Sequence, residues 1–341
     1  MNNIFLRILL LLLMCLSLEA QTIINSEGKT ITIPDNINRV FGSSPPMSYL
    51  IYALNPNKMI GLNFKAKNAQ NGADSKFLTK KFLSLPVIGS YHGGGQNINL
   101  ENLIKYKPEL VLIWQDDLMV QTIKKEMKKI NVPTFMVPFR EIADMPNAFR
   151  VTGKVIGEKE RGEVLAKYSQ NIINEVKSNA SKSTPTRYYY AEGIDGLSTE
   201  CDQSFHVEAI NFAGGINVHK CQQSGLLGLE KISFETLLKY NPDVIIVQTP
   251  VVYNDIMLDP MWKSLKAVKN GRIHLVPTQP FNWIDRPPSF MRVLGIQWLA
   301  KILHPESYKV DLNKRTKEFY NLFLHVKLND AQSKNILGVK K

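Results

Sequence analysis

The chain contains an internal repeat. Residues 99–113 align without a gap on residues 233–247, and the two segments share a pattern of residues and not only a composition. Each begins with a residue that favours a helix N-cap, Asn99 in the first copy and Ser233 in the second, and carries a Glu in the first turn. Each copy therefore predicts a helix that starts at its first residue.

The second part of each copy predicts a buried strand. Pro108 and Pro242 follow about two helical turns and stop the helix, because proline lacks the backbone N–H that a helix needs. Residues 110–113 and 244–247 are apolar without polar alternation, which is typical of parallel strands covered on both faces. One such unit in each half predicts an α/β fold with two mainly parallel-sheet lobes. Domain interfaces commonly hold ligands, so we expect a ligand cleft between the lobes.

A different pattern separates the predicted lobes. Between Lys154 and about Asn179, apolar side chains recur at three- and four-residue spacing and predict one long amphipathic helix. Such a helix gives a rigid join, unlike the crossing strands that permit wide hinge closure. The predicted organisation is a signal peptide at residues 1–20, an N-terminal α/β lobe at 21–150, a linking helix at 151–182, a C-terminal α/β lobe at 183–304, and a C-terminal helix and tail at 305–341.

The first 20 residues have the pattern of a secretory signal peptide. Arg7 precedes an apolar run at residues 8–14, and Ala20 offers a small residue for cleavage. A membrane anchor is the alternative, but the run is shorter than the roughly 18 apolar residues that a span requires. Cys15 is a poor site for lipid attachment because Met14 before it is not small. We therefore expect an exported, periplasmic protein without a lipid anchor.

Charge and cysteine content narrow the class of protein. The formal net charge is +12, but Lys and Arg are spread along the chain and not bunched with aromatic residues, so we expect no nucleic-acid partner. The positive charge favours an anionic ligand or an anionic membrane face, and a generally basic proteome explains it as well. Cys201 and Cys221 remain after export. In an oxidising compartment we expect a disulfide between them, with two unpaired thiols as the alternative.

Several motifs together resemble a known family. In chain order they are residues 87–91 (VIGSY), 99–101 (NLE), 108–111 (PELV), 213–217 (AGGIN), 232–235 (ISFE), 242–245 (PDVI) and 286–289 (RPPS). With these motifs the chain resembles the metal-chelate (siderophore, haem, cobalamin) class of periplasmic substrate-binding proteins of ABC importers, with the ceuE-type iron and nickel chelate binders nearest. The chain departs from the family pattern in the loop at residues 43–48, and it lacks a pair of arginines placed to clamp a ferric siderophore.

The resemblance implies a function and its partners. Proteins of this class capture a metal chelate in the periplasm and deliver it to the permease dimer of an ABC importer in the inner membrane. Glu101 and Glu235 match the positions at which the family carries one glutamate per lobe for docking onto permease arginines. Without any partner, such a carboxylate also interacts favourably with the helix dipole, by about 0.3–1 kcal/mol. We expect a monomer without an intrinsic cofactor, whose transported ligand is the metal chelate.

The histidines argue against capture of a bare metal ion. A free ion needs about four His, Cys or carboxylate ligands that converge on one point. The six histidines are scattered along the chain, and only His92 and His206 lie in loops expected at the cleft. A preformed chelate that takes one or two protein donors fits better, with His92 as the candidate metal ligand.

Eight residues are candidates for contact with the ligand: Met47, Tyr91, His92, Trp114, Glu192, His206, Trp283 and Arg286. Tyr91 and His92 precede three glycines, which permit close backbone approach to a ligand, although a flexible loop with a solvated His has the same pattern. Trp114 follows the strand of the first copy, where α/β proteins place ligands, and is either a core residue or a cleft wall. Trp283 offers an apolar wall. Arg286 offers a grip for a carboxylate, unless it only pairs with Asp285.

The sequence contains no catalytic set. It lacks a G-x-S-x-G motif, a P-loop and a nucleotide-binding fingerprint after a strand. We therefore predict a binding protein and not an enzyme. Two alternatives remain: an exported, chelatase-like metal-handling enzyme, because metal chelatases share the bilobed fold, and a scaffold of the same fold that binds no small ligand.

Overall fold

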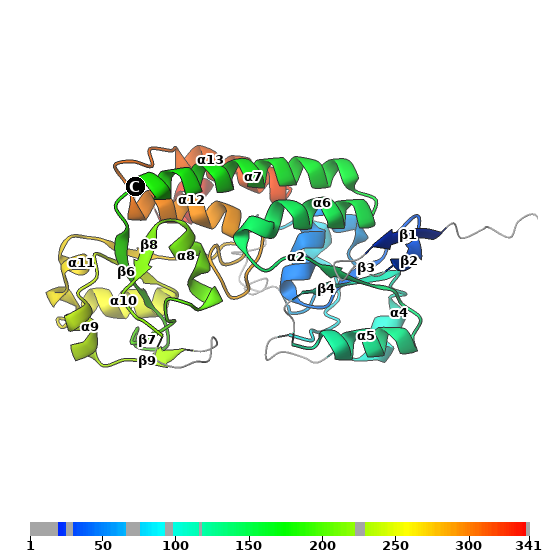
Figure 1. The fold of residues 1–341 in the computed structure, drawn as a ribbon, viewed down its shortest axis with the longest axis horizontal. Coiled ribbons are helices and arrows are strands. Elements are labelled where there is room, and N and C mark those ends of the chain that lie inside the picture. The colour runs from blue at the N-terminus through cyan, green and yellow to red at the C-terminus, as the bar shows by residue number, and fades with distance from the viewer. Residues whose placement is uncertain are drawn as a thin grey trace, which may run out of the picture.

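The computed structural model describes residues 20–24, 30–65, 76–92, 98–115, 118–221 and 229–338. The rest of the predicted signal peptide, Cys15, and the glycines at 93–95 lie outside these residues. The strands are β1 (Ala20–Ile24), β2 (Thr30–Pro34), β3 (Val40–Gly42), β4 (Leu110–Trp114), β5 (Thr134–Val137), β6 (Thr186–Ala191), β7 (Ser198–Thr199), β8 (Gly215–Asn217), β9 (Glu230–Lys231), β10 (Val244–Val247) and β11 (Ile273–Leu275). Figure 1 shows two lobes side by side under one layer of helices.

The helices fall into two groups. Those of the lobes are α2 (Pro45–Leu54), α3 (Lys80–Leu83), α4 (Leu100–Lys105), α5 (Val120–Lys129), α8 (Glu208–Phe212), α9 (Phe234–Tyr240), α10 (Pro250–Leu258) and α11 (Lys266–Lys269). The helical layer contains α6 (Met145–Val155), α7 (Lys159–Lys182), α12 (Arg292–Leu303), α13 (Leu312–Phe323) and α14 (Asp330–Ile336). Short 3-10 turns lie at η1 (Pro56–Lys58), η3 (Ile142–Asp144), η4 (Phe205–Val207) and η5 (Trp262–Ser264).

Each lobe is built on a parallel sheet, as predicted. The first sheet has the order β3-β4-β5, and the second has the order β11-β10-β6-β8. Residues 59–62 and 85–89 form only isolated bridges, Val40 with Met59 and Leu62 with Val87. The left-handed Gly89, with φ 118°, bends the chain away after one bridge.

The repeat forms the same unit in both lobes. The side chain of Asn99 accepts a hydrogen bond from the backbone N–H of Glu101 at the start of α4, and Ser233 accepts one from Thr236 in α9. The strand that follows, β4 or β10, has a parallel neighbour on each side. Alternate residues of these strands face different cores, so every position is buried.

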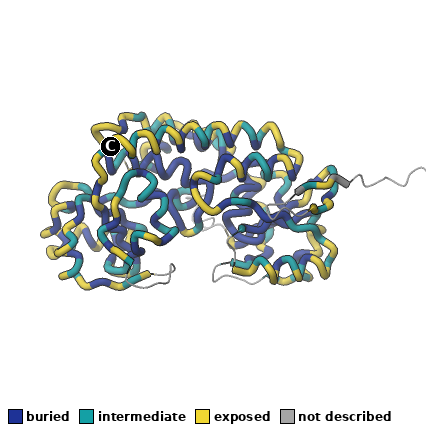
Figure 2. Tube along the Cα trace, in the orientation of Figure 1, coloured by how far each residue is buried: buried dark blue, intermediate teal, exposed yellow. Residues whose placement is uncertain are grey.

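The helical layer ties the lobes together. The largest buried cluster includes Leu112 of the first sheet, Ile172 of α7 and Ile246 of the second sheet. Figure 2 shows this buried interior running from one lobe into the other. The predicted single helix over residues 154–179 is interrupted, because Gly157 adopts φ 76° and separates α6 from α7. The segment 151–182 therefore contains the end of α6 and all of α7.

Two further features concern export. Cys201 and Cys221 form a disulfide, with an S–S distance of 2.03 Å, beside the short antiparallel pair of β7 and β9. Among the described residues, no helix combines the length and apolarity that a membrane crossing requires.

Candidate functional site

Four aromatic side chains form a row between the lobes. Trp114, the last residue of β4, has His92 at one edge, with ring centroids 5.6 Å apart, and Phe205 of the second lobe on the other, at 6.5 Å. Phe205 in turn lies 3.9 Å from the ring of His206. We call His92, Trp114, Phe205 and His206 the aromatic row. It contains three of the predicted ligand-contact residues and one, Phe205, that the sequence did not reveal.

The backbone positions the first half of the row. The Nε1–H of Trp114 donates to the carbonyl oxygen of Phe139 at 2.6 Å, which fixes the indole at the carboxyl end of the sheet. The hydroxyl of Ser90 donates to the carbonyl of His92 and accepts from its N–H, so the turn before the row is held on both sides. Tyr91 points elsewhere, because its hydroxyl donates to Glu126 of α5. Burial, followed by that hydrogen bond, raises the pKa of Tyr91 well above its ordinary value.

A buried carboxylate orients the histidine of the second lobe. The Nδ1 atom of His206 lies 2.5 Å from Oδ2 of Asp285, which is fully buried. With Nδ1–H donating to the carboxylate, Nε2 is the ring nitrogen left for a ligand or a metal. A carboxylate behind an imidazole is the usual second partner of a metal-binding histidine.

Three buried acids surround Arg286. Its Nε lies 2.9 Å from Oε1 of Glu192 and its Nη2 donates to Glu200, while Asp285 lies 3.7 Å away. The Arg286 side chain is 34% exposed, whereas the carboxylates are buried. Arg286 has φ 55°, a left-handed backbone that a non-glycine residue adopts only where its surroundings enforce it. Glu200 was not among the predicted site residues.

A second arginine supports the site from within. Arg292, at the start of α12, is 1% exposed and its Nη1 lies 2.6 Å from Glu208. Its other nitrogens donate to the carbonyls of Ile284 and Phe205, which hold the two loops that carry the site. Glu208 also accepts the backbone N–H of Ile142 from the first lobe at 2.7 Å. Arg292 gave no sequence signal, because it lies in an otherwise ordinary helix.

The carboxylates at this site outnumber the arginines that pair with them. Burial raises the pKa of Glu192 to about 7, although its ion pair and hydrogen bond with Arg286 act in the opposite direction. Within the described part of the chain, Oε2 of Glu192 and Oδ1 of Asp285 are buried without a hydrogen-bond partner. The cluster therefore carries one carboxyl whose charge state changes near neutral pH.

Stability should consequently depend on pH through Glu192. Because its folded pKa of about 7 lies above the ordinary 4.5, the folded state binds more protons than the unfolded state between these values. The contribution is complete below about pH 4.5 and is lost as pH rises through 7. Between pH 4.5 and 8 the wild type should therefore lose roughly 3 kcal/mol of its free energy of unfolding, measured in urea. The Glu192→Gln variant should not show this loss.

A matched control for this pH effect is Glu163, an acid of the helical layer paired with Arg150. The pKa of Glu163 is lowered, chiefly by the hydrogen bond from Arg150. Glu163→Gln should therefore change the pH dependence of stability at lower pH than Glu192→Gln does. If the free energies of unfolding of the wild type and of Glu192→Gln changed in parallel between pH 4.5 and 8, Glu192 would not be the group that titrates near neutral pH.

The structure buries four of the predicted ligand contacts. Trp114 is 5% exposed and belongs to the largest core cluster. Met47 and Trp283 are fully buried in the core, and Glu192 is buried behind Arg286. Met47 lies within α2, which already begins at Pro45, so its side chain packs inward. Trp283 packs over Gly295 of α12, and its Nε1 donates to the carbonyl of Gln279. These residues support the site and do not line it.

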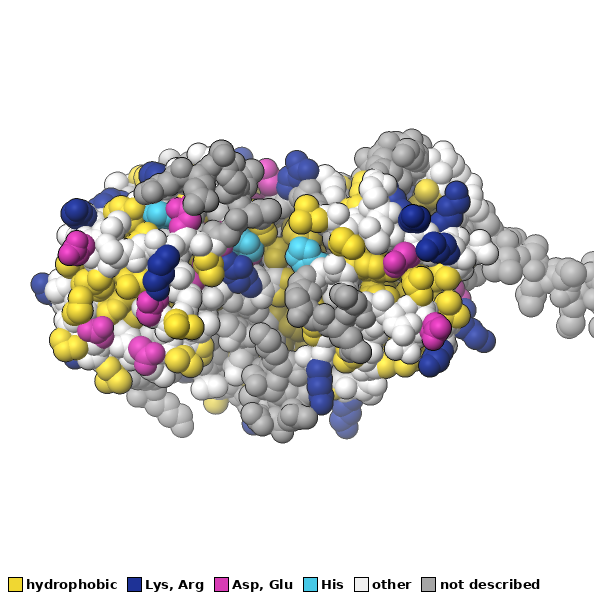
Figure 3. Space-filling view, turned by 90° about the horizontal axis from the view of Figure 1, so that it is seen from below, with side chains coloured by type: hydrophobic (Ala, Val, Ile, Leu, Met, Phe, Trp, Pro, Cys, Tyr) yellow, Lys and Arg dark blue, Asp and Glu magenta, His cyan; other side chains and the backbone are white. Residues whose placement is uncertain are grey.

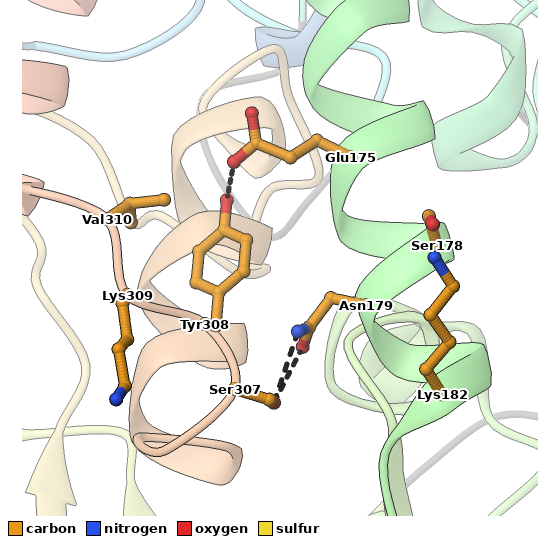
Figure 4. Close-up of a pocket in the computed structure, with 8 residues that line it drawn as sticks. All are labelled: Glu175, Ser178, Asn179, Lys182, Ser307, Tyr308, Lys309 and Val310. Carbon is orange, nitrogen blue, oxygen red and sulfur yellow. Dashed lines mark hydrogen bonds between the residues drawn. The ribbon is translucent and has the colours of Figure 1, made fainter.

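A separate pocket lies away from the face between the lobes. Figure 3 shows histidine, basic and hydrophobic side chains gathered in the middle of the molecule, seen from below. The pocket in Figure 4 lies instead between α7 and residues 307–310. There Glu175 accepts the hydroxyl of Tyr308 at 2.7 Å and pairs with Arg315 at 2.8 Å. Its acid is thus already satisfied, and we assign it no ligand.

The described residues offer no closed site for a bare metal ion. Their one group of three candidate ligands is Cys201, Asp202 and Cys221, and its two sulfurs are joined in the disulfide. The imidazoles of His92 and His206 come from opposite lobes, and each can supply one donor.

Comparison with known proteins identifies relatives of the whole chain. A family model described as periplasmic binding protein matches residues 86–280. A solved ABC transporter solute binding protein from Sulfurospirillum deleyianum is 39% identical, with a TM-score of 0.86, covering 93% of this chain and 99% of its own. Molybdate-binding protein MolA from Haemophilus influenzae is 23% identical over 90% of this chain and 92% of its own length. Helicobacter pylori CeuE with Ni(II) bound is 17% identical, with a TM-score of 0.68, covering 93% and 99%.

Proposed function

The chain belongs to the periplasmic binding protein family, and on this premise we propose that it captures a metal chelate and delivers it to an ABC importer. Members of this family are substrate-binding proteins and not enzymes, so the chelatase-like alternative is set aside. The cargo we propose is a ferric siderophore, a nickel or cobalt chelate, cobalamin or haem. The place of capture is the periplasm.

The aromatic row carries this proposal. It offers the partly exposed ring of Phe205, packed against the buried Trp114, together with one imidazole from each lobe, a combination that suits an organic chelator around a metal with one or two open positions. Asp285 behind His206 favours a role of that imidazole as a metal donor. His92 and His206 are the metal-donor candidates, and Phe205, supported from behind by the buried Trp114, is the candidate for contact with the chelator.

The charges favour a chelate over a simple oxyanion. The MolA relative binds molybdate, and Arg286 is the cation that an oxyanion would seek. However, Glu192 and Glu200 already bond to this guanidinium, and these carboxylates would repel a bare dianion at short range. A chelate instead places its metal at the histidines and only its periphery near Arg286. Molybdate is therefore the second candidate.

Delivery requires contact with the importer. Glu101 and Glu235 are both exposed in the first turns of α4 and α9, one in each lobe. Their equivalent positions support docking of these two carboxylates onto the two halves of a permease dimer in the inner membrane. A single copy of the chain, with one glutamate per lobe, is sufficient for this arrangement.

Calorimetry and thermal unfolding test the proposed ligand class. Free Ni²⁺ and Fe³⁺ should bind weakly, because the described residues provide too few donors, whereas one chelate among Ni(II)–histidine, ferric siderophores, cobalamin and haem should stabilise the fold. Stabilisation of about 2.7 kcal/mol is expected at 100 times the dissociation constant. His92→Ala and His206→Ala should weaken this binding. His274→Ala, in β11, is the control and should not.

One result would contradict the ligand class directly. Submicromolar binding of a bare ion, unimproved by any chelator, would require a closed set of protein ligands that the proposal does not contain. Tight binding of molybdate alone would favour the second candidate.

A further inference from the structure

The repeat continues onto the protein surface. Three residues after each candidate docking glutamate, the chain carries an exposed apolar residue: Ile104 after Glu101 and Leu238 after Glu235. Ile104 is 48% exposed and Leu238 is 43% exposed. Residues three apart on a helix are neighbours on one face, so each carboxylate has an apolar side chain beside it.

Core packing does not explain these two residues. The preceding residues, Leu103 in α4 and Leu237 in α9, are fully buried and connect their helices to the sheets. Single exposed hydrophobic residues are common and need no explanation on their own. Here the same exposed pair, a carboxylate and an aliphatic side chain, occurs at equivalent positions of two lobes.

We propose that Ile104 with Glu101, and Leu238 with Glu235, form two equivalent docking patches for a two-fold symmetric membrane partner. This inference rests on the proposed delivery to an importer. It adds that each half of the partner presents an apolar pocket next to a cationic group. The charged pair guides and orients the approach, and burial of the aliphatic side chain gives the complex its lifetime.

A symmetric partner accounts for the duplication. A protein with one chain can meet both halves of a dimer equally only if its two lobes carry matching surfaces. The apolar contacts would then occupy the centre of each patch, where interfaces exclude charged residues and concentrate their binding energy. A second copy of this chain is the competing occupant, and the experiment includes it.

The test measures binding to the importer's permease–ATPase complex reconstituted in lipid nanodiscs. Ile104→Gln and Leu238→Gln should each weaken binding about fivefold, because about half of an aliphatic side chain remains to be buried. The double variant should bind about 25-fold more weakly, since the lobes are far apart and independent. Val164→Gln is the control, because Val164 is 50% exposed on α7 in the helical layer and should leave binding unchanged.

The Glu101→Ala/Glu235→Ala variant distinguishes failure of the apolar patches from failure of the proposed docking. If it loses binding while Ile104→Gln/Leu238→Gln binds normally, the apolar patches are wrong and the delivery function stands. If both double variants bind normally, the proposed docking itself fails. Sedimentation of the wild type should give a monomer. A dimer that the Gln substitutions dissociate would show that a second copy occupies the patches, and would overturn the inference.

Discussion

Replacing Arg286 with Met should lower the free energy of unfolding by about 3 kcal/mol at pH 8 and prevent tight ligand binding. Met retains the length of the side chain, so the change mainly removes charge. Glu192 and Glu200 would remain buried without their shared cation, whereas Asp285 would keep Arg292 at 3.6 Å, and leaving a buried carboxylate unpaired costs about 3–5 kcal/mol. We expect the lower end, because the Arg286 side chain is 34% exposed to solvent. Urea denaturation measures the change.

The pH dependence identifies the cause of this loss. Glu192 already has a pKa of about 7, and without Arg286 it should stay protonated to higher pH, so the deficit should shrink at pH 5. Combining Arg286→Met with Glu192→Gln should recover part of the stability at pH 8. Arg150→Met is the matched control, because Arg150 is 40% exposed and pairs with one partly exposed acid. It should cost no more than about 1 kcal/mol. Equal losses for the two arginines would contradict the buried acid cluster.

Replacing both Glu101 and Glu235 with Ala should abolish uptake of the ligand in cells while ligand affinity and folding change little. The side chains are exposed, and their only expected contribution to stability is the helix-dipole interaction, worth about 0.3–1 kcal/mol each. Uptake is measured with labelled ligand in cells that depend on this protein. Each single variant should retain part of the uptake, because one lobe still docks.

Glu160 provides the control for docking. It is an exposed glutamate in the first turn of α7, in the helical layer, so Glu160→Ala removes the same dipole interaction without touching either repeat. It should leave uptake intact. Normal uptake by the Glu101→Ala/Glu235→Ala variant, at normal protein levels, would leave the helix dipole as the sole role of these carboxylates.

Local patterns sufficed to predict much of the fold. The N-caps, prolines and apolar runs of the two repeat copies are local signals, and the structure has the expected helix and strand in each lobe. Burial of both strand faces also follows from the sequence, since the runs show no polar alternation. The disulfide was one of two open alternatives, because spacing alone does not decide the pairing of cysteines.

The details of the site depend on contacts between distant segments, and local patterns do not reveal these. Arg286 bonds to Glu192 and Glu200, which lie 94 and 86 positions away in the chain and come together only in the folded second lobe. The same holds for Phe205, whose neighbour Trp114 belongs to the other lobe. A tryptophan at position 283 could form a cleft wall, but in the folded protein it packs over α12 and is buried in the core.

Native mass spectrometry of the protein purified from its own periplasm tests the central claim most directly. The account predicts one added mass per chain equal to a metal plus an organic chelator, and this mass should be absent from the Arg286→Met and His206→Ala variants. An added mass equal to a bare metal ion or to molybdate, in a protein that retains its fold, would contradict the proposal that the lobes capture a metal chelate.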